Sequence, residues 1–248
     1  MNLEKFFGMH SKVAIAFSGG VDSAYLLYVA TRYGVDIHAY YVKSAFQPQF
    51  ELDDAKCLAE QLNVKMTVIP LDVLVCDNIA RNPSNRCYYC KRAIFQAIAI
   101  AAETDGFTDL LDGTNASDEE GDRPGMKALR ELNVLSPLRE CGLTKHEVRS
   151  LSKEAGLFTW DKPAYACLAT RISTGELITR EKLQATETAE KYLSDLGFTD
   201  FRVRMTGKAA KLQLKREQFG ELLERREEIV KELKKHYSAV LLDIEERT

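Results

Sequence analysis

"AFSGGVDSAYLL", residues 16–27, joins the end of an apolar run to the start of a helical pattern. The apolar run, residues 13–17, is short and nearly continuous, as expected of a strand that is buried on both faces. A Ser-Gly-Gly turn follows at 18–20, and the helical spacing of residues 21–34 stops at a glycine. Two glycines let backbone N–H groups approach an anion closely, and a helix N-terminus adds positive potential. The stretch therefore predicts a phosphate-binding turn between strand and helix; a plain glycine turn is the alternative.

The rest of the first half repeats this alternation of strand and helix. A capping box at Thr144 and Glu147 marks the start of its last helix. Alternation of this kind implies right-handed crossovers and a parallel sheet with helices on both faces. We therefore expect an α/β fold built on a doubly wound parallel sheet. The expected strands are 36–42, 65–71 and 109–115, and the expected helices are 51–64, 88–106, 125–134 and 144–157.

The second part of the chain has a different organisation. Residues 158–175 show no clear period, which is typical of a functional loop. The pattern beyond it predicts a small α+β unit. We therefore expect two domains, 1–175 and 176–248. The elements expected after the boundary are a helix at 180–196, strands at 201–207 and 209–215, a charged helix at 217–236 and a strand at 239–244.

Composition narrows the class of protein. With 45% hydrophobic residues and a formal net charge of −3, the chain has the composition of a soluble globular protein without a broad basic field. Nucleic acid is therefore not the expected partner. The sequence contains no run of 18 apolar residues, and its start lacks the apolar region of a signal peptide. We expect no membrane association and a cytoplasmic location, where the six cysteines stay reduced.

Within the stretch 109–115, the predicted strand ends at the acidic residue Asp112 and a turn follows. Because parallel strands present their carboxyl ends at one edge of the sheet, Asp112 is expected on the same edge as residues 18–23. It is a candidate for the nucleotide site. The alternative is a turn with a local side-chain cap.

The cysteines suggest a second chemistry. Cys87 and Cys90 form a C-x-x-C pair beside basic residues and just before the predicted helix. Such a pair is a redox dithiol, half of a zinc site or part of an iron–sulfur site. Cys167 lies in the aperiodic loop with Lys162 and Arg171 nearby, and these cations would stabilise its thiolate. Three thiolates can hold a [4Fe–4S] cluster with one iron left open. The remaining cysteines fit small buried or incidental positions: Cys57, Cys76 and Cys141.

The string S-G-G-x-D-S is not a Walker A loop, because no G-K-[ST] follows. It resembles the PP-loop of the ATP pyrophosphatase superfamily, whose fold is the adenine nucleotide alpha hydrolase-like fold. Members activate a carboxylate or carbonyl group with ATP as an adenylate and release pyrophosphate. The resemblance implies ATP and Mg²⁺ as cofactors. The implied phosphate-binding residues are Ser18, Gly19, Gly20, Val21, Asp22 and Ser23.

Longer strings make the resemblance more specific. The strings at 112–129, 136–145, 151–172 and 178–183 are similar to the LarE-type ATP-dependent sulfur transferases of nickel-pincer nucleotide biosynthesis. The resemblance implies adenylation of a carboxylate of pyridinium-3,5-biscarboxylic acid mononucleotide, followed by sulfur transfer to give a thiocarboxylate. The partners it implies are a sulfur donor, a downstream nickel-inserting enzyme and further copies of the chain.

That family has two forms. In one form a single cysteine, which matches Cys167, gives up its own sulfur. In the other, a C-x-x-C is added and three cysteines hold a [4Fe–4S] cluster that carries a transferable sulfide. Since this chain has Cys87, Cys90 and Cys167, the resemblance favours the cluster form. Sacrificial transfer from Cys167 and a cluster-dependent tRNA thiolase are the alternatives. A nucleotide-binding module with structural zinc, or an amidotransferase or NAD synthetase, leaves cysteines without a role.

The resemblance also implies site residues. Cys167, Asp22 and Arg171 are the expected catalytic residues, and Arg171 is further expected to clamp a phosphate or carboxylate of the substrate. Arg202 and Arg204 alternate on a predicted strand and so share one face. They are candidate substrate ligands, with exposed strand charges as the alternative. Glu190 is a weaker candidate, for which a solvated helix face is the competing interpretation.

Overall fold

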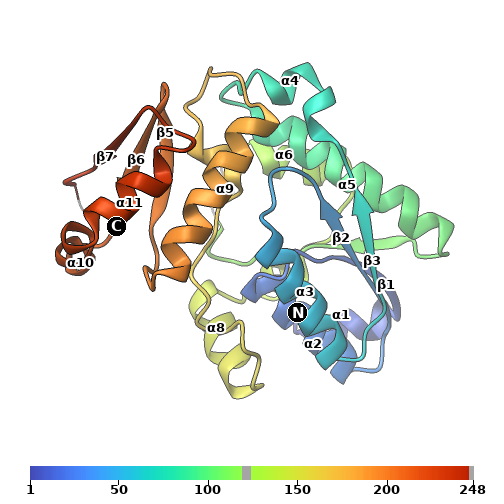
Figure 1. Cartoon of the computed structure of the whole chain (residues 1–248). Helices are drawn as coiled ribbons and strands as arrows, with labels where there is room; N and C mark the ends of the chain where they lie inside the picture. The colour runs from blue at the N-terminus through green and yellow to red at the C-terminus, as the bar shows by residue number, and fades with distance from the viewer. Residues whose placement is uncertain (119–123, 246–248) are drawn as a thin grey trace. The chain divides into compact units, whose positions relative to one another are not determined.

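The computed structural model describes residues 1–118 and 124–245 (Figure 1). Residues 119–123, which belong to one of the strings that carry the family resemblance, lie outside the described residues. The chain forms two compact units. The first unit comprises residues 1–73 and 85–164, and the second comprises residues 74–84 and 165–248.

The first unit holds the predicted parallel sheet. Its strands lie in the order β3-β2-β1-β4, and each adjacent pair is parallel. The strands are β1 Lys12–Ala16, β2 Asp36–Lys43, β3 Met66–Pro70 and β4 Asp109–Leu111. The helices are α1 Leu3–Met9, α2 Val21–Arg32, α3 Gln49–Gln61, α5 Arg86–Thr104, α6 Pro124–Glu131, α7 Pro137–Glu140 and α8 Lys145–Glu154.

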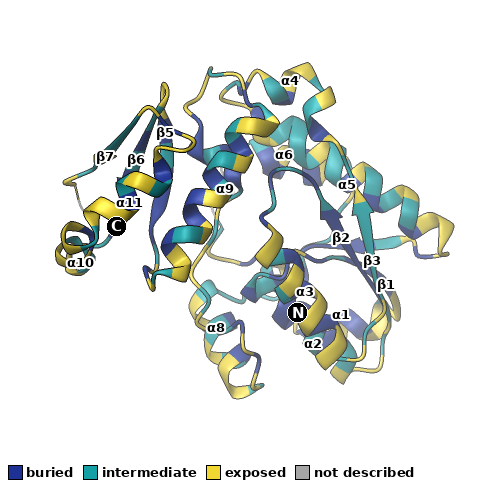
Figure 2. Cartoon of the chain, in the orientation of Figure 1, coloured by how far each residue is buried: buried dark blue, intermediate teal, exposed yellow. Residues whose placement is uncertain are grey.

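Two apolar cores cover the two faces of this sheet, so the doubly wound α/β fold is confirmed. Val13 and Ile15 point to a core that includes side chains of α1, α2, α3 and α8. Ala14, between them, points to the other core, with side chains of α5 and α6. Figure 2 shows strands β1 and β2 dark blue where they are buried between the helices. Burial on both faces explains why residues 13–17 are apolar without alternation.

Local signals at the helix ends are also confirmed. Gly34 has a φ of +68° directly after the C-cap of α2, as its position in the sequence predicts. Thr144 caps α8 by accepting from the Glu147 backbone, and the Glu147 carboxylate accepts from the Thr144 backbone N–H at 2.8 Å. This capping box fixes where α8 begins, which places Lys145 at its first position.

The second unit contains a three-stranded sheet in the order β5-β6-β7. Strands β5 and β6 are antiparallel, whereas β6 and β7 are parallel. The strands are β5 Arg202–Thr206, β6 Ala209–Gln213 and β7 Ala239–Leu242, and the helices are α4 Asp77–Ala80, α9 Arg180–Asp195, α10 Phe219–Glu224 and α11 Arg226–Leu233, with 3₁₀ turns η2 Leu168–Arg171 and η3 Arg216–Gln218.

The limits of this unit differ from the domain boundary expected at residue 175, because the compact unit begins at Tyr165 and takes in residues 74–84. Hydrogen bonds explain the association. The Asn82 side chain donates to the carbonyls of Ile172 and Ser173, at 3.2 and 2.8 Å. The Asn82 carbonyl accepts from the Gly175 N–H at 2.8 Å.

One predicted element is wrong in extent. The charged run 217–236 is not one helix: it breaks at Arg225 into α10 and α11. There the Arg225 guanidinium donates to the Leu196 carbonyl at 2.9 Å, a tertiary contact that no helical pattern reports. Helix α1, packed by the buried Phe6 and Phe7, is an element that the sequence pattern did not predict.

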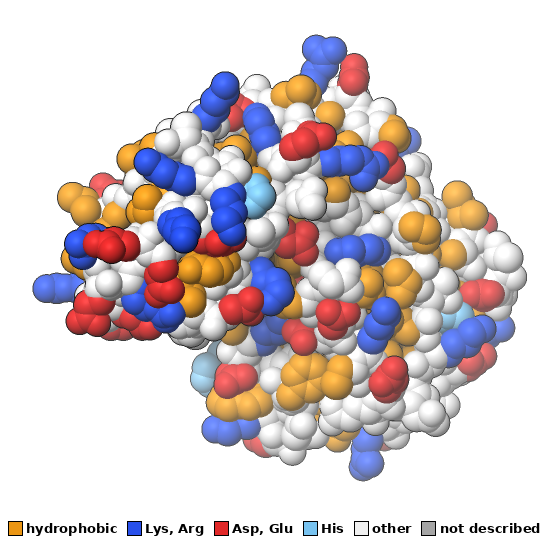
Figure 3. Space-filling view, viewed as in Figure 1, with side chains coloured by type: hydrophobic (Ala, Val, Ile, Leu, Met, Phe, Trp, Pro, Cys, Tyr) orange, Lys and Arg blue, Asp and Glu red, His pale blue; other side chains and the backbone are white. Residues whose placement is uncertain are grey.

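Among the described helices, none is both long and apolar enough to cross a membrane. Lysine and arginine side chains alternate with aspartate and glutamate on the face drawn in Figure 3, without a broad field of one sign. This mixture agrees with the small net charge of the chain.

Candidate functional site

The turn at residues 18–20 is shaped by Gly19 and by the hydroxyls of Ser18 and of Ser23 in α2. Gly19 has a φ of +73°, and a Cβ there would lie 3.1 Å from both the Ala55 Cβ and the Glu51 carbonyl. Only glycine fits this position without strain. The hydroxyls of Ser18 and Ser23 lie 3.1 Å apart, and Ser23 donates to the Gly20 carbonyl at 3.1 Å. Hydrogen bonds among residues 18–23 therefore hold the turn in shape at the start of α2.

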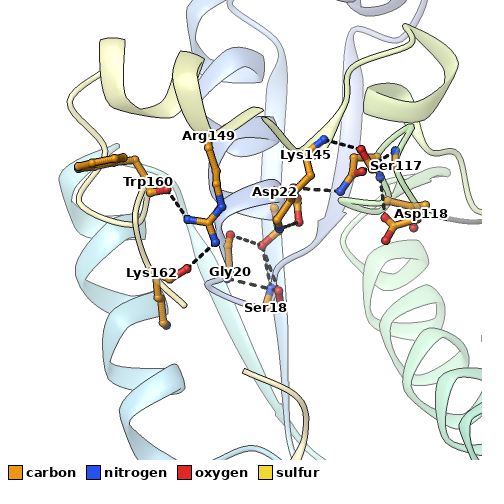
Figure 4. Close-up of polar contacts among 12 residues, drawn as sticks. Ser18, Gly20, Asp22, Ser117, Asp118, Lys145, Arg149, Trp160 and Lys162 are labelled. Carbon is orange, nitrogen blue, oxygen red and sulfur yellow. Dashed lines mark hydrogen bonds and ion pairs between the residues drawn. The ribbon is translucent and has the colours of Figure 1, made fainter. Parts of the chain in front are cut away.

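Asp22 lies in the first turn of α2 and is held from two sides (Figure 4). Its Oδ1 accepts from the Asn115 side chain at 3.2 Å, and its Oδ2 lies 2.5 Å from the Lys145 Nζ. Three segments far apart in the sequence thus meet at one carboxylate beside the predicted phosphate turn. Sequence reasoning missed Asn115 and Lys145, because nothing local indicates which residue a loop amide or a first-turn lysine will contact.

Asp112 is buried just after β4, and its contacts are internal. Its Oδ1 accepts from the Ser136 hydroxyl at 2.7 Å and from the Thr114 N–H at 3.2 Å, and its Oδ2 accepts from the Thr114 hydroxyl. This is the turn cap that was the alternative to nucleotide contact. A nucleotide-binding role for Asp112 stays a prediction.

The neighbouring Gly113 approaches α2 closely. A Cβ on Gly113 would lie 2.8 Å from the Ser23 backbone nitrogen and 3.1 Å from its Cα. Real Cβ atoms do not approach a backbone so closely, so a glycine is needed where this turn packs on the first turn of α2. The D-G pair is a turn signal in the sequence, but the close approach follows only from the fold.

The sequence predicted that Cys87 and Cys90 precede a helix. They lie instead in the first turns of α5, which begins at Arg86. Residues three apart on a helix share a face, so both thiols are on the same side of α5. Cys87 is exposed and Cys90 is partly buried. The Arg86 guanidinium is 3.9 Å from the Cys87 sulfur and stands over the Phe46 ring at 6.0 Å. A cation therefore stands beside the first thiol.

The segment that leads toward Cys167 is fastened to the first unit. Arg149 of α8 donates to the carbonyls of Trp160 and Lys162, at 2.7 Å each (Figure 4). The Lys162 ammonium lies 2.7 Å from Asp54 and 5.4 Å from the centre of the Phe50 ring. Lys162 was expected near the thiol of Cys167, but its ammonium contacts two side chains of α3 in the first unit.

Cys167 belongs to the second unit and caps the 3₁₀ turn η2. Its carbonyl accepts from both the N–H and the hydroxyl of Thr170, at 2.9 Å each. The side chain is partly exposed. This turn fixes the backbone around the cysteine and places Arg171 at its end.

Arg171 is almost fully buried, with 1% of its surface exposed, and pairs with Glu190 of α9. Burial alone would lower the pKa of Arg171, but its hydrogen bonds to Glu190 and the charge of that carboxylate outweigh burial and raise it. Glu190 also accepts from the Val203 N–H at 2.9 Å. The interpretation of Glu190 as part of a solvated helix face is wrong. Its carboxylate is neutralised by Arg171 and accepts a hydrogen bond from the backbone of β5.

Tyr165 joins the two arginines that face it. The guanidinium carbons of Arg171 and Arg202 lie 4.7 and 5.0 Å from the centre of its ring. Its hydroxyl donates to Glu190 at 2.5 Å, and burial, followed by the charge of Glu190, raises the pKa of Tyr165. Sequence reasoning did not select Tyr165. Arg202 is buried rather than an exposed strand charge.

Arg204 extends this cluster. Its Nε lies 2.5 Å from the Gln213 side chain, and it donates to the Thr170 carbonyl at 2.8 Å. The second unit therefore brings together the predicted residues Arg171, Glu190, Arg202 and Arg204 around the turn that starts at Cys167. The first unit brings together the turn 18–23 and Asp112. Among the described residues, no group of three or more His, Cys, Asp and Glu side chains is arranged to hold a metal ion.

A parallel sheet whose first strand runs into S-G-G-x-D-S at the start of α2 defines the PP-loop class of nucleotide-using proteins. The family of queuosine biosynthesis proteins, QueC, matches residues 12–82, which span this loop. The chain belongs to the family of LarE-type sulfur transferases. It is 35% identical over 214 residues to the pyridinium-3,5-bisthiocarboxylic acid mononucleotide synthase of Lactiplantibacillus plantarum, covering 86% of this chain and 78% of that protein.

Two further proteins are similar to this chain. An uncharacterized protein of Synechocystis sp. is 37% identical over 90% of this chain and 84% of its own length. A tRNA-specific 2-thiouridylase, MnmA, of Fervidobacterium nodosum is 25% identical over 60% of this chain and 53% of its own length. The chain is thus an ATP-dependent sulfurtransferase of the PP-loop type.

Proposed function

We propose that this protein adenylates a carboxylate of pyridinium-3,5-biscarboxylic acid mononucleotide and converts it to a thiocarboxylate. The observation that carries the proposal is the 35% identity, over 86% of the chain, to a synthase of the corresponding bisthiocarboxylic acid mononucleotide. The similarity to MnmA covers only 60% of this chain, which favours the small nucleotide over tRNA.

The adenylation step requires a carboxylate oxygen of the substrate to attack the α-phosphorus of ATP, so that the bond to pyrophosphate breaks. The turn 18–23, with its helix N-terminus, is proposed to bind the phosphates: Ser18, Gly19, Gly20, Val21, Asp22 and Ser23. Mg²⁺ neutralises charge on the leaving pyrophosphate, and hard oxygen ligands such as the Asp22 carboxylate suit it. Asp112, on the same sheet edge, is proposed to support this site through its turn.

The sulfur step replaces AMP on the acyl carbon by sulfur. The thiols of Cys87, Cys90 and Cys167 are the proposed ligands of a [4Fe–4S] cluster, which would supply a transferable sulfide. The donor chemistry fits, because thiolates are the ligands of such clusters and two of these thiols share one face of α5. Cys167, the third proposed ligand, belongs to the second unit.

A self-consuming transfer from Cys167 is the alternative route to the same product. It needs one cysteine and gives Cys87 and Cys90 no role. Two thiols one helical turn apart, with the Arg86 guanidinium beside the first, favour the cluster route. In that route a sulfur donor restores the sulfide, and a nickel-inserting enzyme uses the product. Six free cysteines also agree with a reducing cytoplasm as the place of action.

The substrate is proposed to bind at the arginine cluster of the second unit. Arg171, Arg202 and Arg204 supply fixed guanidinium groups suited to phosphate or carboxylate. Glu190 orients Arg171 through two hydrogen bonds, 2.7 and 3.1 Å long. The same chain, in a homo-oligomer, is the proposed active species.

Pyrophosphate release tests this function directly. We expect the release of pyrophosphate from ATP to depend on the pyridinium biscarboxylate mononucleotide. Mass spectrometry should find a product in which sulfur has replaced one or two carboxylate oxygens of the substrate. Release that depends on tRNA instead, with thiolated uridine as product, would contradict the proposal.

A further inference from the structure

We propose that Lys145 is a residue of the ATP site that changes partner: it neutralises Asp22 when no nucleotide is bound and moves to the polyphosphate when Mg²⁺ and ATP bind. The inference rests on the proposed use of ATP at the turn 18–23. It concerns a residue that ends one of the strings similar to the family but is not among the predicted site residues.

The backbone of Lys145 is fixed while its ammonium can move. Lys145 is the first residue of α8, its N–H donates to the Ser117 hydroxyl at 2.9 Å, and the capping box of Thr144 sets the helix start. The side chain is 35% exposed and reaches Asp22 over a flexible four-carbon stem. A small rotation about that stem can redirect the charge without moving the helix.

Charge explains why a partner change is needed. A phosphate bound at the N-terminus of α2 lies beside the Asp22 carboxylate, and two anions this close repel each other unless a cation separates them. Mg²⁺ binds carboxylate and phosphate oxygens together. With the Asp22 carboxylate paired to such a cation, the ammonium of Lys145 would gain more from the polyphosphate, which carries several negative charges.

The surroundings of Asp22 are prepared for this exchange. Asn115 holds Oδ1 at 3.2 Å, so the carboxylate keeps its orientation when the lysine leaves Oδ2. The other cations in Figure 4 have different tasks: Arg149 donates to two backbone carbonyls, and Lys162 pairs with Asp54. Of these three cations, Lys145 is the one directed at the phosphate turn.

The first test is the affinity for ATP with Mg²⁺, measured by titration calorimetry on the full chain. Lys145→Met is expected to weaken binding by about tenfold to a hundredfold, the usual value of a hydrogen bond to a charged group. Lys145→Arg should retain most of the affinity. Lys153→Met is the matched control, since Lys153 lies on the same helix but stands over the Trp160 ring, and it should bind as the wild type does.

A double-mutant cycle separates a phosphate ligand from a residue that only holds Asp22. Asp22→Asn removes the repulsive carboxylate and leaves the ammonium free for phosphate, so this variant should bind ATP without Mg²⁺. Adding Lys145→Met to it should then weaken that binding by a similar factor. Equal affinity of the single and double variants, or no binding by Asp22→Asn, would overturn the inference.

The outcomes also separate this inference from the proposed function. Wild-type protein that binds ATP and releases pyrophosphate, with Lys145→Met unchanged in affinity, rejects the role of Lys145 alone. Wild-type protein that does not bind ATP with Mg²⁺ rejects both. Thermal unfolding without nucleotide shows whether Lys145→Met is folded, and Lys145→Arg decides the case if it is not.

Discussion

Arg171 and Glu190 form a buried ion pair with two contacts, Nε to Oε1 at 2.7 Å and Nη2 to Oε2 at 3.1 Å. The pair links the turn after Cys167 to helix α9, and Glu190 also accepts the Val203 N–H of β5. One carboxylate therefore joins three elements of the second unit. Loss of its charge should be felt in the stability of that unit.

We predict that Glu190→Gln lowers the free energy of unfolding by about 3 kcal/mol, because removing one charge of a buried pair leaves the other uncompensated. Denaturant unfolding measures the change. Asp195→Asn is the control on the same helix: its ion pair with Lys191 is exposed, so the change should stay within about 0.5 kcal/mol. Equal losses in the two variants would show that burial of the pair is not decisive.

Gly113→Ala should disturb the proposed nucleotide site by displacing the backbone at the start of α2. The added Cβ would meet the Ser23 backbone nitrogen at 2.8 Å, so either the turn or the first turn of α2 must shift. We expect a loss of about 1–3 kcal/mol in stability and weaker ATP binding, measured by unfolding and by titration. Gly8→Ala, where a Cβ meets no atom within 4 Å, is the control and should be neutral or stabilising. Unchanged ATP binding in Gly113→Ala would refute the predicted link.

His38 should make the first unit less stable in mild acid. Its ring is buried, stacks on Tyr40 and bonds to the Thr67 hydroxyl at 2.8 Å. Burial, aided by Lys65, lowers the pKa of His38 from 6.5, although Asp105 and Asp36 act in the opposite direction. The folded state thus binds the proton more weakly than the unfolded state. Stability is complete above about pH 6.5 and is lost as the pH falls from there toward the lowered pKa.

The measurement is the free energy of unfolding between pH 7.5 and pH 5 for wild type and His38→Gln, values chosen to bracket the ordinary histidine pKa of about 6.5. Glutamine can keep a hydrogen bond to Thr67 and does not titrate. We expect a smaller fall in the variant. A fall of the same size would assign the pH dependence to other groups.

Substitutions should separate the two chemical steps. Asp22→Ala is expected to abolish pyrophosphate release, because the nucleotide loses its proposed carboxylate partner for Mg²⁺. Cys167→Ala should keep substrate-dependent pyrophosphate release but yield no thiolated product. Full thiolation by Cys167→Ala would refute the role given to this cysteine.

The sequence predicted the first unit well because its signals are local. The buried strand 13–17, the glycine that ends α2 and the capping box of α8 each depend on a few neighbouring residues. It did not predict contacts between distant segments. The hydrogen bonds between Asn82 and the loop that contains Cys167 have no local signal in the sequence, and neither has the helix break at Arg225.

The same limit applies to the site. The motif indicated Asp22, whereas Asn115 and Lys145, which hold it, were found only from the fold. Arg202 and Arg204 of β5 were chosen for their spacing, but Tyr165, over whose ring Arg202 stands, was not, because a tyrosine in an irregular loop resembles any other. The sequence thus indicates which residues carry the chemistry of the site, whereas the contacts of those residues follow from the tertiary structure.

In the proposed function, three cysteines make this protein a reusable sulfur carrier. Iron and acid-labile sulfide analysis of anaerobically purified wild type and Cys90→Ser tests it most directly, with Cys57→Ser, an exposed cysteine of α3, as the control. We predict about four irons per chain in wild type and in Cys57→Ser, and loss of iron in Cys90→Ser. Iron-free, colourless wild type that thiolates its substrate once per chain, with Cys90→Ser equally active, would contradict the account.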